Sequence, residues 1–158
     1  RQWGEGAKLY IGNFCSIASG VTIYLGGNHR TDWISTYPFG YINQNIFDNY
    51  NGDGHPSTKG NVTIGNDVWI GENVTIMSGV TIEDGAVIAN NSHVVQNVKA
   101  YSLIGGNPAK LIKHRFTKGL IEKLLQIKWW YWDDNKINRL SPLLCNTDID
   151  VFKKEALL

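Results

Sequence analysis

Isoleucine recurs at every sixth position through the middle of this 158-residue chain. The column runs Ile64, Ile70, Ile76, Ile82 and Ile88 and is continued by Val94. A second column of small or branched residues follows four positions later, at Val68, Val74, Val80, Ala86, Ser92 and Val98. Side chains six apart point about 240° apart on an α-helix, whereas short strands that bend at regular corners aim them into one interior. The period therefore predicts an all-β solenoid.

The same spacing appears near the N-terminus, where Ile11, Ile17 and Ile23 are six residues apart. We expect these residues to belong to the same solenoid. The phase is then lost until Ile64, which predicts a long excursion loop over residues 24–61. Loops of this length are uncommon in compact domains, and ordered ones usually carry function. Because the loop is rich in aromatic residues, which argue against disorder, we interpret it as the active-site loop.

Beyond the last sextet the pattern changes to that of a helix. Thr117 is placed to cap it, and Leu120 and Leu124 recur at helical spacing. The sequence therefore predicts a β-solenoid over residues 1–115 and a C-terminal α-helical tail over residues 116–158.

Composition excludes several classes of function. Fifteen Lys and Arg against 14 Asp and Glu give a formal net charge of +1, without the one-sided field that nucleic-acid or membrane-surface binding needs. No apolar stretch approaches the roughly 20 residues of a membrane span. Cys15 and Cys145 lie far apart, outside any metal or redox spacing, so we expect a reduced, cytoplasmic setting. Residues 1–4 look like neither a natural start nor a signal peptide, and we expect further residues to precede them.

His29 is the candidate catalytic base. Histidine titrates near neutral pH, so its imidazole suits removal of a proton from a hydroxyl. Gly26 and Gly27 precede it, and a flexible backbone there would let the ring approach a bound thioester. Asp32 and Arg30 are placed to orient His29 through a hydrogen bond, and a surface ion pair between them is the alternative.

Two stretches of sequence resemble a known family. The sextets IGNDVW (64–69) and IGENVT (70–75) resemble the hexapeptide-repeat acyltransferases. The segments NHRTDW (28–33) and STYPF (35–39) are similar to the xenobiotic acetyltransferase branch, which includes virginiamycin and type B chloramphenicol acetyltransferases and related glycan O-acetyltransferases. The resemblance implies a left-handed parallel β-helix with three sextets per turn, a homotrimer, acetyl-CoA as co-substrate without a metal, and His29 as the base.

The resemblance also assigns binding residues. It places Trp69, at the corner position of its sextet, beside the thioester arm, although packing on a neighbouring subunit is the alternative. It makes the segment 105–110 a loop that closes over CoA, with nearby cations suited to phosphate, and a solvated basic face is the alternative. The cofactor candidates are Trp69, Gly79, Gly106, Asn107, Lys110, Lys113 and Arg115. The acceptor candidates are Trp33, Tyr37 and Phe39, because aromatic rings stack on sugars and macrocycles alike.

The leading prediction is an acetyl-CoA-dependent O-acetyltransferase that acts on a hydroxyl of a sugar, polysaccharide or antibiotic. Residues 26–29 and 55–60 look more like the sugar-modifying relatives and favour a glycan acceptor. An antibiotic-resistance acetyltransferase is the alternative within the class, and a catalytically silent β-helix scaffold is the alternative outside it. His55, His93 and His114 lie in no metal-ligand pattern, and we interpret them as noncatalytic.

Overall fold

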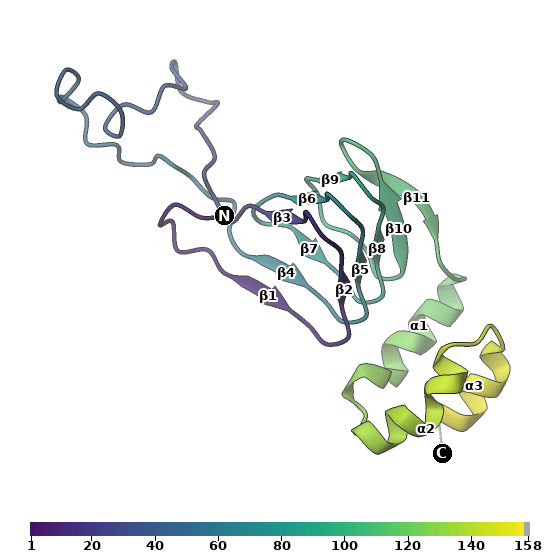
Figure 1. Ribbon diagram of the computed structural model, residues 1–158. Coiled ribbons are helices and arrows are strands. Elements are labelled where there is room, and N and C mark those ends of the chain that lie inside the picture. Colours follow the sequence, from purple (N-terminus) through teal and green to yellow (C-terminus); the bar gives the residue numbers. More distant parts are fainter. Residues whose placement is uncertain (157–158) are drawn as a thin grey trace. The chain divides into compact units, whose positions relative to one another are not determined.

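The structure is a computed structural model that describes residues 1–156 (Figure 1). The chain divides into two compact units, Arg1–His114 and Arg115–Leu158, which we call the β-unit and the helical unit. Positions 157 and 158 of the predicted tail lie outside the described residues.

The β-unit is built from short strands in three sheets, ordered β1-β4-β7, β11-β10-β8-β5-β2 and β3-β6-β9. The strands are β1 (Leu9–Ile11), β2 (Ser16–Ile17), β3 (Thr22–Ile23), β4 (Val62–Ile64), β5 (Trp69–Ile70), β6 (Thr75–Ile76), β7 (Thr81–Ile82), β8 (Val87–Ile88), β9 (His93–Val94), β10 (Ser102–Gly105) and β11 (Lys110–His114). From β4 to β9 the chain visits the three sheets in turn, and Thr63 pairs in parallel with Thr81, three sextets later. One sextet therefore spans one side, and three sextets make one circuit.

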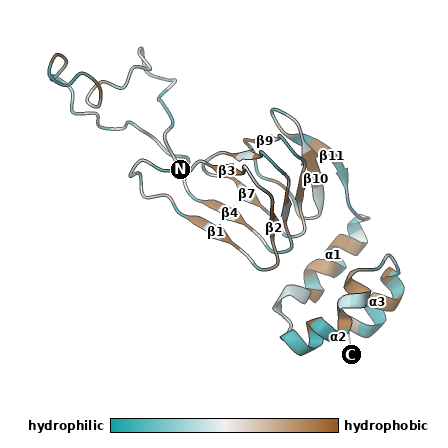
Figure 2. Cartoon of the chain, viewed as in Figure 1, coloured by the Kyte–Doolittle hydropathy of each residue, from teal (hydrophilic) through white to brown (hydrophobic). Residues whose placement is uncertain are grey.

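The two columns of the sextet repeat form the core of the β-unit. Ile64, Ile70, Ile76, Ile82 and Ile88 are each at most 1% exposed, and the second column is buried with them. Figure 2 shows the apolar character of these strands. Burying one such side chain stabilises the fold by about 1.5–3 kcal/mol. Ile11 and Ile17 belong to the same column but are 46% and 42% exposed, because β1 and β2 each have a neighbouring strand on one side only. The interior predicted from the period is confirmed.

The corners of the β-unit fall at the fourth position of the sextet. Asp67, Asn73, Gly79, Gly85 and Asn91 all have left-handed φ there, between 53° and 79°. Glycine, asparagine and aspartate tolerate this conformation best.

The prediction that Trp69 lies at a corner is wrong, since it belongs to strand β5. Its side chain is 54% exposed while Ile70 is buried, because neighbouring side chains of a strand face opposite ways. The Trp69 side chain therefore points away from the buried interior.

The loop 24–61 of the β-unit connects β3 to β4 and projects away from the sheets (Figure 1). The two arms of the loop meet close to the sheets at Asn28 and Ser57, and we call this part of the loop its neck. A pair of backbone hydrogen bonds between these residues, at 3.0 and 2.9 Å, closes the neck. The Asn28 side chain donates to the Ser78 hydroxyl at 3.0 Å, which ties the neck to the β-unit. Strand β1 nevertheless pairs with β4 in parallel, with Leu9 opposite Val62. The loop is thus an insertion that leaves the sheet register intact.

The helical unit contains α1 (Lys118–Ile127), a 3-10 turn (Trp129–Tyr131), α2 (Asp134–Leu144) and α3 (Ile149–Ala156). The Thr117 hydroxyl accepts from the Leu120 N–H at 3.4 Å, which confirms the predicted cap, and Leu124 is buried. Within residues 1–156, none of the helices has the length and apolarity needed to cross a membrane.

Candidate active site

The neck of the loop brings two histidines together. His29 directly follows Asn28, and His55 lies two residues before Ser57. The antiparallel pairing of Asn28 with Ser57 therefore brings the two histidines next to each other on opposite arms of the loop. Their ring centroids are 4.5 Å apart, and the planes meet at 69°. Both rings line a cavity of about 280 Å³, whose other lining residues are Trp3, Gly27, Pro38, Tyr41, Ile42 and Pro56.

The position of one hydrogen defines what His29 can do chemically. Its Nδ1 lies 2.7 Å from the backbone carbonyl oxygen of Thr36. A carbonyl oxygen only accepts, so in the neutral ring the hydrogen sits on Nδ1 and the lone pair on Nε2. A histidine held through Nδ1 with Nε2 left to accept a proton has the arrangement of a general base.

Arg30 and Asp32 pair with each other. The Arg30 Nε donates to the Asp32 carboxylate at 2.7 Å, a second contact joins the same groups, and the guanidinium lies over the Trp33 ring. The hydrogen bond from Arg30 lowers the pKa of the Asp32 carboxyl. We expected Asp32 to hold His29 through a hydrogen bond. In the structure the Thr36 carbonyl makes the hydrogen bond to His29 Nδ1. Of the two alternatives for Asp32, the surface ion pair is the one present.

The two glycines before His29 make room for the N-terminal segment. The Glu5 carboxylate accepts from the N–H groups of Gly27 and Trp3, at 2.5 and 2.9 Å. A Cβ at Gly26 would overlap this carboxylate, and a Cβ at Gly27, where φ is +78°, would overlap the Trp3 ring. Burial works to raise the pKa of Glu5, but the backbone hydrogen bonds together lower it. The Glu5 carboxylate and the Trp3 ring thus occupy the space that side chains at positions 26 and 27 would need.

We expect Gly27→Ala to destabilise the protein more than Gly6→Ala does. Both positions have similar positive φ, +78° and +82°, where a side chain costs roughly 1–2 kcal/mol. A Cβ at Gly6 meets nothing within 4 Å, whereas at Gly27 it displaces Trp3. Thermal unfolding of the two variants measures the difference. Equal decreases in Tm would show that Trp3 does not need the space beside Gly27.

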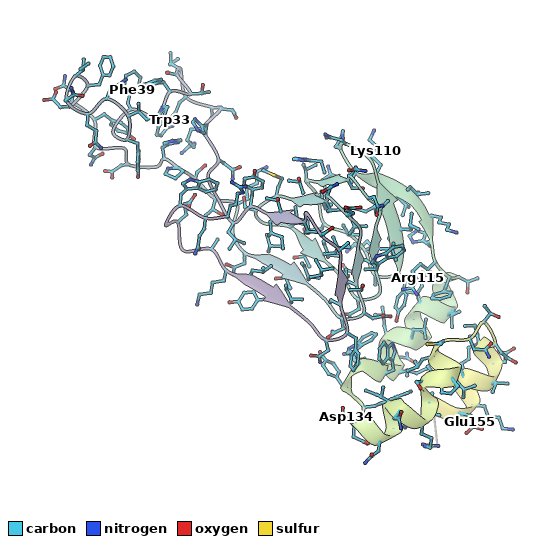
Figure 3. All side chains as sticks on the ribbon, viewed as in Figure 1. Trp33, Phe39, Lys110, Arg115, Asp134 and Glu155 are labelled. Atoms are coloured by element: carbon cyan, nitrogen blue, oxygen red, sulfur yellow. The ribbon has the colours of Figure 1, made fainter. Side chains whose placement is uncertain are left out.

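The acceptor candidates come together at the tip of the loop, where Figure 3 labels Trp33 and Phe39. A largely apolar cavity of about 590 Å³ is lined by Asp32, Trp33, Ile34, Ser35, Tyr37, Phe39 and Tyr50. The rings of Tyr37 and Phe39 are 4.7 Å apart, and those of Trp33 and Tyr50 are 6.0 Å apart. Tyr50 escaped the sequence reasoning because it lies on the returning arm, outside the motif that marked the others.

Several cofactor candidates have roles within the fold. Gly79 is a corner residue whose N–H donates to the Gly60 carbonyl at 3.0 Å, and a Cβ there would lie 2.7 Å from the Lys59 oxygen. The segment predicted to close over CoA is the turn between β10 and β11, which contains Gly106 and Asn107. The Gly106 carbonyl accepts from the His93 N–H at 2.9 Å, so the turn is held against β9.

The basic candidates divide between the two units. Lys110 and Lys113 are exposed on β11, in the β-unit, while Arg115 begins the helical unit and lies over the Phe116 ring. In Figure 3 Lys110 lies apart from the loop tip that holds Trp33 and Phe39. Within the β-unit of a single chain, Lys110 and the loop tip are therefore not brought together.

The remaining histidines differ in their surroundings. His93 lies in β9, and the His114 Nδ1 is 3.3 Å from the Ser102 hydroxyl, both outside the His29 cavity. His55, interpreted from sequence as noncatalytic, lines that cavity. Across residues 1–156 no group of three or more His, Cys, Asp or Glu side chains is arranged to hold a metal ion.

Comparisons with known proteins place this chain among acetyltransferases. The family model described as bacterial transferase hexapeptide (six repeats) matches residues 61–96. A probable macrolide acetyltransferase from Lysinibacillus sphaericus is 52% identical over 84% of this chain and 74% of its own length. A virginiamycin A acetyltransferase from Staphylococcus aureus is 46% identical over 97% and 70%. A chloramphenicol acetyltransferase from Klebsiella aerogenes is 45% identical over 90% and 68%.

Two solved structures share the fold at lower identity. A hexapeptide-repeat acetyltransferase from Vibrio cholerae O1 biovar eltor, complexed with acetyl coenzyme A, is 28% identical with a TM-score of 0.50, over 69% of this chain and 50% of that one. A maltose O-acetyltransferase from Clostridium difficile 630 has the same identity and TM-score, over 69% and 49%. This chain thus spans about half of each solved chain. With sequence relatives at 45–52% identity over at least two thirds of their length, the chain belongs to the hexapeptide-repeat acetyltransferases.

Proposed function

We propose that this protein is an acetyl-CoA-dependent O-acetyltransferase that acetylates a hydroxyl of a bulky acceptor, with His29 as the general base. The observation that carries the proposal is the His29 imidazole, which lines a cavity with its Nδ1 held by the Thr36 carbonyl and its Nε2 left to accept a proton. The acetyltransferase relatives and the acetyl coenzyme A complex of the Vibrio cholerae protein support the choice of acetyl donor.

In the proposed reaction His29 Nε2 removes the proton of the acceptor hydroxyl as its oxygen attacks the thioester carbonyl carbon. The tetrahedral intermediate collapses, the carbon–sulfur bond breaks, and the imidazolium returns the proton to the CoA sulfur. The Thr36 carbonyl accepts from Nδ1–H throughout and stabilises the charged ring. General-base catalysis of this kind contributes about 10²–10⁴-fold to the rate.

The acceptor we propose has an apolar face. The four rings at the loop tip, from Trp33, Tyr37, Phe39 and Tyr50, line a cavity large enough for a molecule of that kind. Relatives named for chloramphenicol, macrolides and virginiamycin A favour an antibiotic hydroxyl. A sugar hydroxyl is the second candidate, favoured by the fold shared with a maltose O-acetyltransferase and by the stacking of aromatic rings on sugars.

The proposed assembly is a homotrimer of left-handed parallel β-helices, formed by residues 1–115, with residues 116–158 as the helical tail. A second copy would complete the site, since one chain keeps the loop tip and Lys110 apart. Trp69, Gly79, Gly106, Asn107, Lys110, Lys113 and Arg115 remain our candidates for CoA. The free thiols of Cys15 and Cys145 fit a reduced, cytoplasmic setting.

Acetyl-CoA-dependent thiol release measured against a panel of hydroxyl compounds tests the proposal. The panel contains chloramphenicol, a streptogramin A, a macrolide, maltose and a galactoside. We expect one compound class to stimulate release, and Phe39→Ala to raise the KM of that acceptor while the KM of acetyl-CoA stays constant. Ile46→Ala is the control, because Ile46 is exposed in the same loop but does not line the cavity. CoA binding without stimulation by any compound would favour the silent scaffold.

A further inference from the structure

We propose that His55 is a positioning residue for His29. In this proposal the His55 ring holds the His29 imidazole in the orientation in which Nδ1 donates to the Thr36 carbonyl and Nε2 is left for the acceptor hydroxyl. The orientation is a property of the folded chain, and only its consequence for turnover rests on the proposed function.

His55 is held in place by ring contacts and by a backbone hydrogen bond. Its ring meets His29 on one side and makes an edge contact with the Tyr41 ring, whose centroid is 5.7 Å away. Its backbone N–H donates to the Gly52 carbonyl at 3.0 Å. The residue is only 9% exposed, in a loop whose side chains are mostly exposed. His55 is therefore the more firmly held of the two histidines.

His29 needs a neighbouring ring to hold its orientation, because its Nδ1 hydrogen bond fixes only one atom of the imidazole. A single hydrogen bond permits the ring to pivot about that contact, whereas packing of a neighbouring ring removes the pivot. A general base works only within hydrogen-bond reach of the proton that it takes. A misplacement of about 1 Å can cost about 10²-fold in rate. The neighbour that sets this orientation is consequently important for turnover.

The surroundings of His55, its burial above all, favour the neutral ring. Burial, and after it the charge of His29, lower the pKa of His55, while the Glu5 carboxylate works in the opposite direction. Arg30 is paired with Asp32, and the Tyr41 phenol is a further titratable group that meets the ring. Two protonated imidazoles at this separation would repel each other. An uncharged His55 places no second positive charge beside the His29 ring.

Nitrogen-15 NMR of the imidazoles reads the orientation independently of activity. The chain has four histidines, and His29→Ala assigns the His29 signal. We expect the Nδ1–H tautomer at His29 in the parent, a mixture of tautomers in His55→Ala, and the parental tautomer in His55→Phe, which keeps a ring against His29. A pure Nδ1–H signal in His55→Ala would overturn the proposal. Loss of that tautomer in both variants would overturn it as well, since ring packing would then not orient the base.

Steady-state kinetics provides the second readout. We expect His55→Ala to lower kcat by about 10–100-fold with the KM of acetyl-CoA unchanged, and His55→Phe to retain kcat within about fivefold. If His55→Phe abolished turnover as completely as His29→Ala, a nitrogen of His55 would be required for the reaction and positioning by ring packing would be refuted. Absence of turnover in the parent with every acceptor would count against the proposed function, while the NMR result would still decide the positioning role.

Discussion

Replacing His29 with alanine is expected to lower kcat by about 10²–10⁴-fold, because that is the contribution of a positioned general base. The acceptor hydroxyl would then have to lose its proton to water, and the Thr36 carbonyl would have no ring to hold. Thiol release from acetyl-CoA, measured with the acceptor that the panel identifies, gives the ratio of parent to variant.

Two controls separate loss of the base from loss of the fold. Asp150→Asn removes a partner of the exposed Lys153 ion pair in the helical unit and should keep kcat within about fivefold, because exposed pairs contribute little. Calorimetry should show that His29→Ala binds CoA as the parent does. Turnover of His29→Ala within a few-fold of the parent would refute the assignment of the base.

Replacing Ile76 with alanine is expected to lower the free energy of unfolding by about 2–5 kcal/mol. Ile76 is fully buried in the centre of the isoleucine column, where the circuits above and below prevent the β-unit from closing the resulting cavity. Urea denaturation, followed by circular dichroism at constant protein concentration, measures the loss.

Ile17→Ala is the matched control, because Ile17 has the same place in the repeat but is 42% exposed. Less apolar surface returns to water there, so the loss should be clearly smaller. Equal losses at the two positions would mean that the column does not carry the stability of the β-unit.

Much of the fold could be predicted because its rule is local and repeated. Each sextet places one isoleucine inward and a turn-forming residue at the next corner, so Ile64 and Ile82 occupy equivalent places in successive circuits. The cap at Thr117 was predictable for a related reason, since its partner Leu120 lies three residues away. The position of Trp69 was predicted less well, because the spacing alone does not say where in the sextet the corner falls.

The sequence by itself therefore predicted the period, the interior columns, the extent of the loop and, through its resemblance to a known family, His29 as the candidate base. Only the tertiary structure decided what surrounds that histidine. His55 reaches it because the Asn28–Ser57 pairing closes a loop of no regular period, and Glu5 and Trp3 reach its glycines from another segment. Contacts that form when an irregular loop closes produce no regular spacing of residues in the sequence. In a repeat, by contrast, the same packing recurs in every sextet, so the spacing of its residues is visible in the sequence.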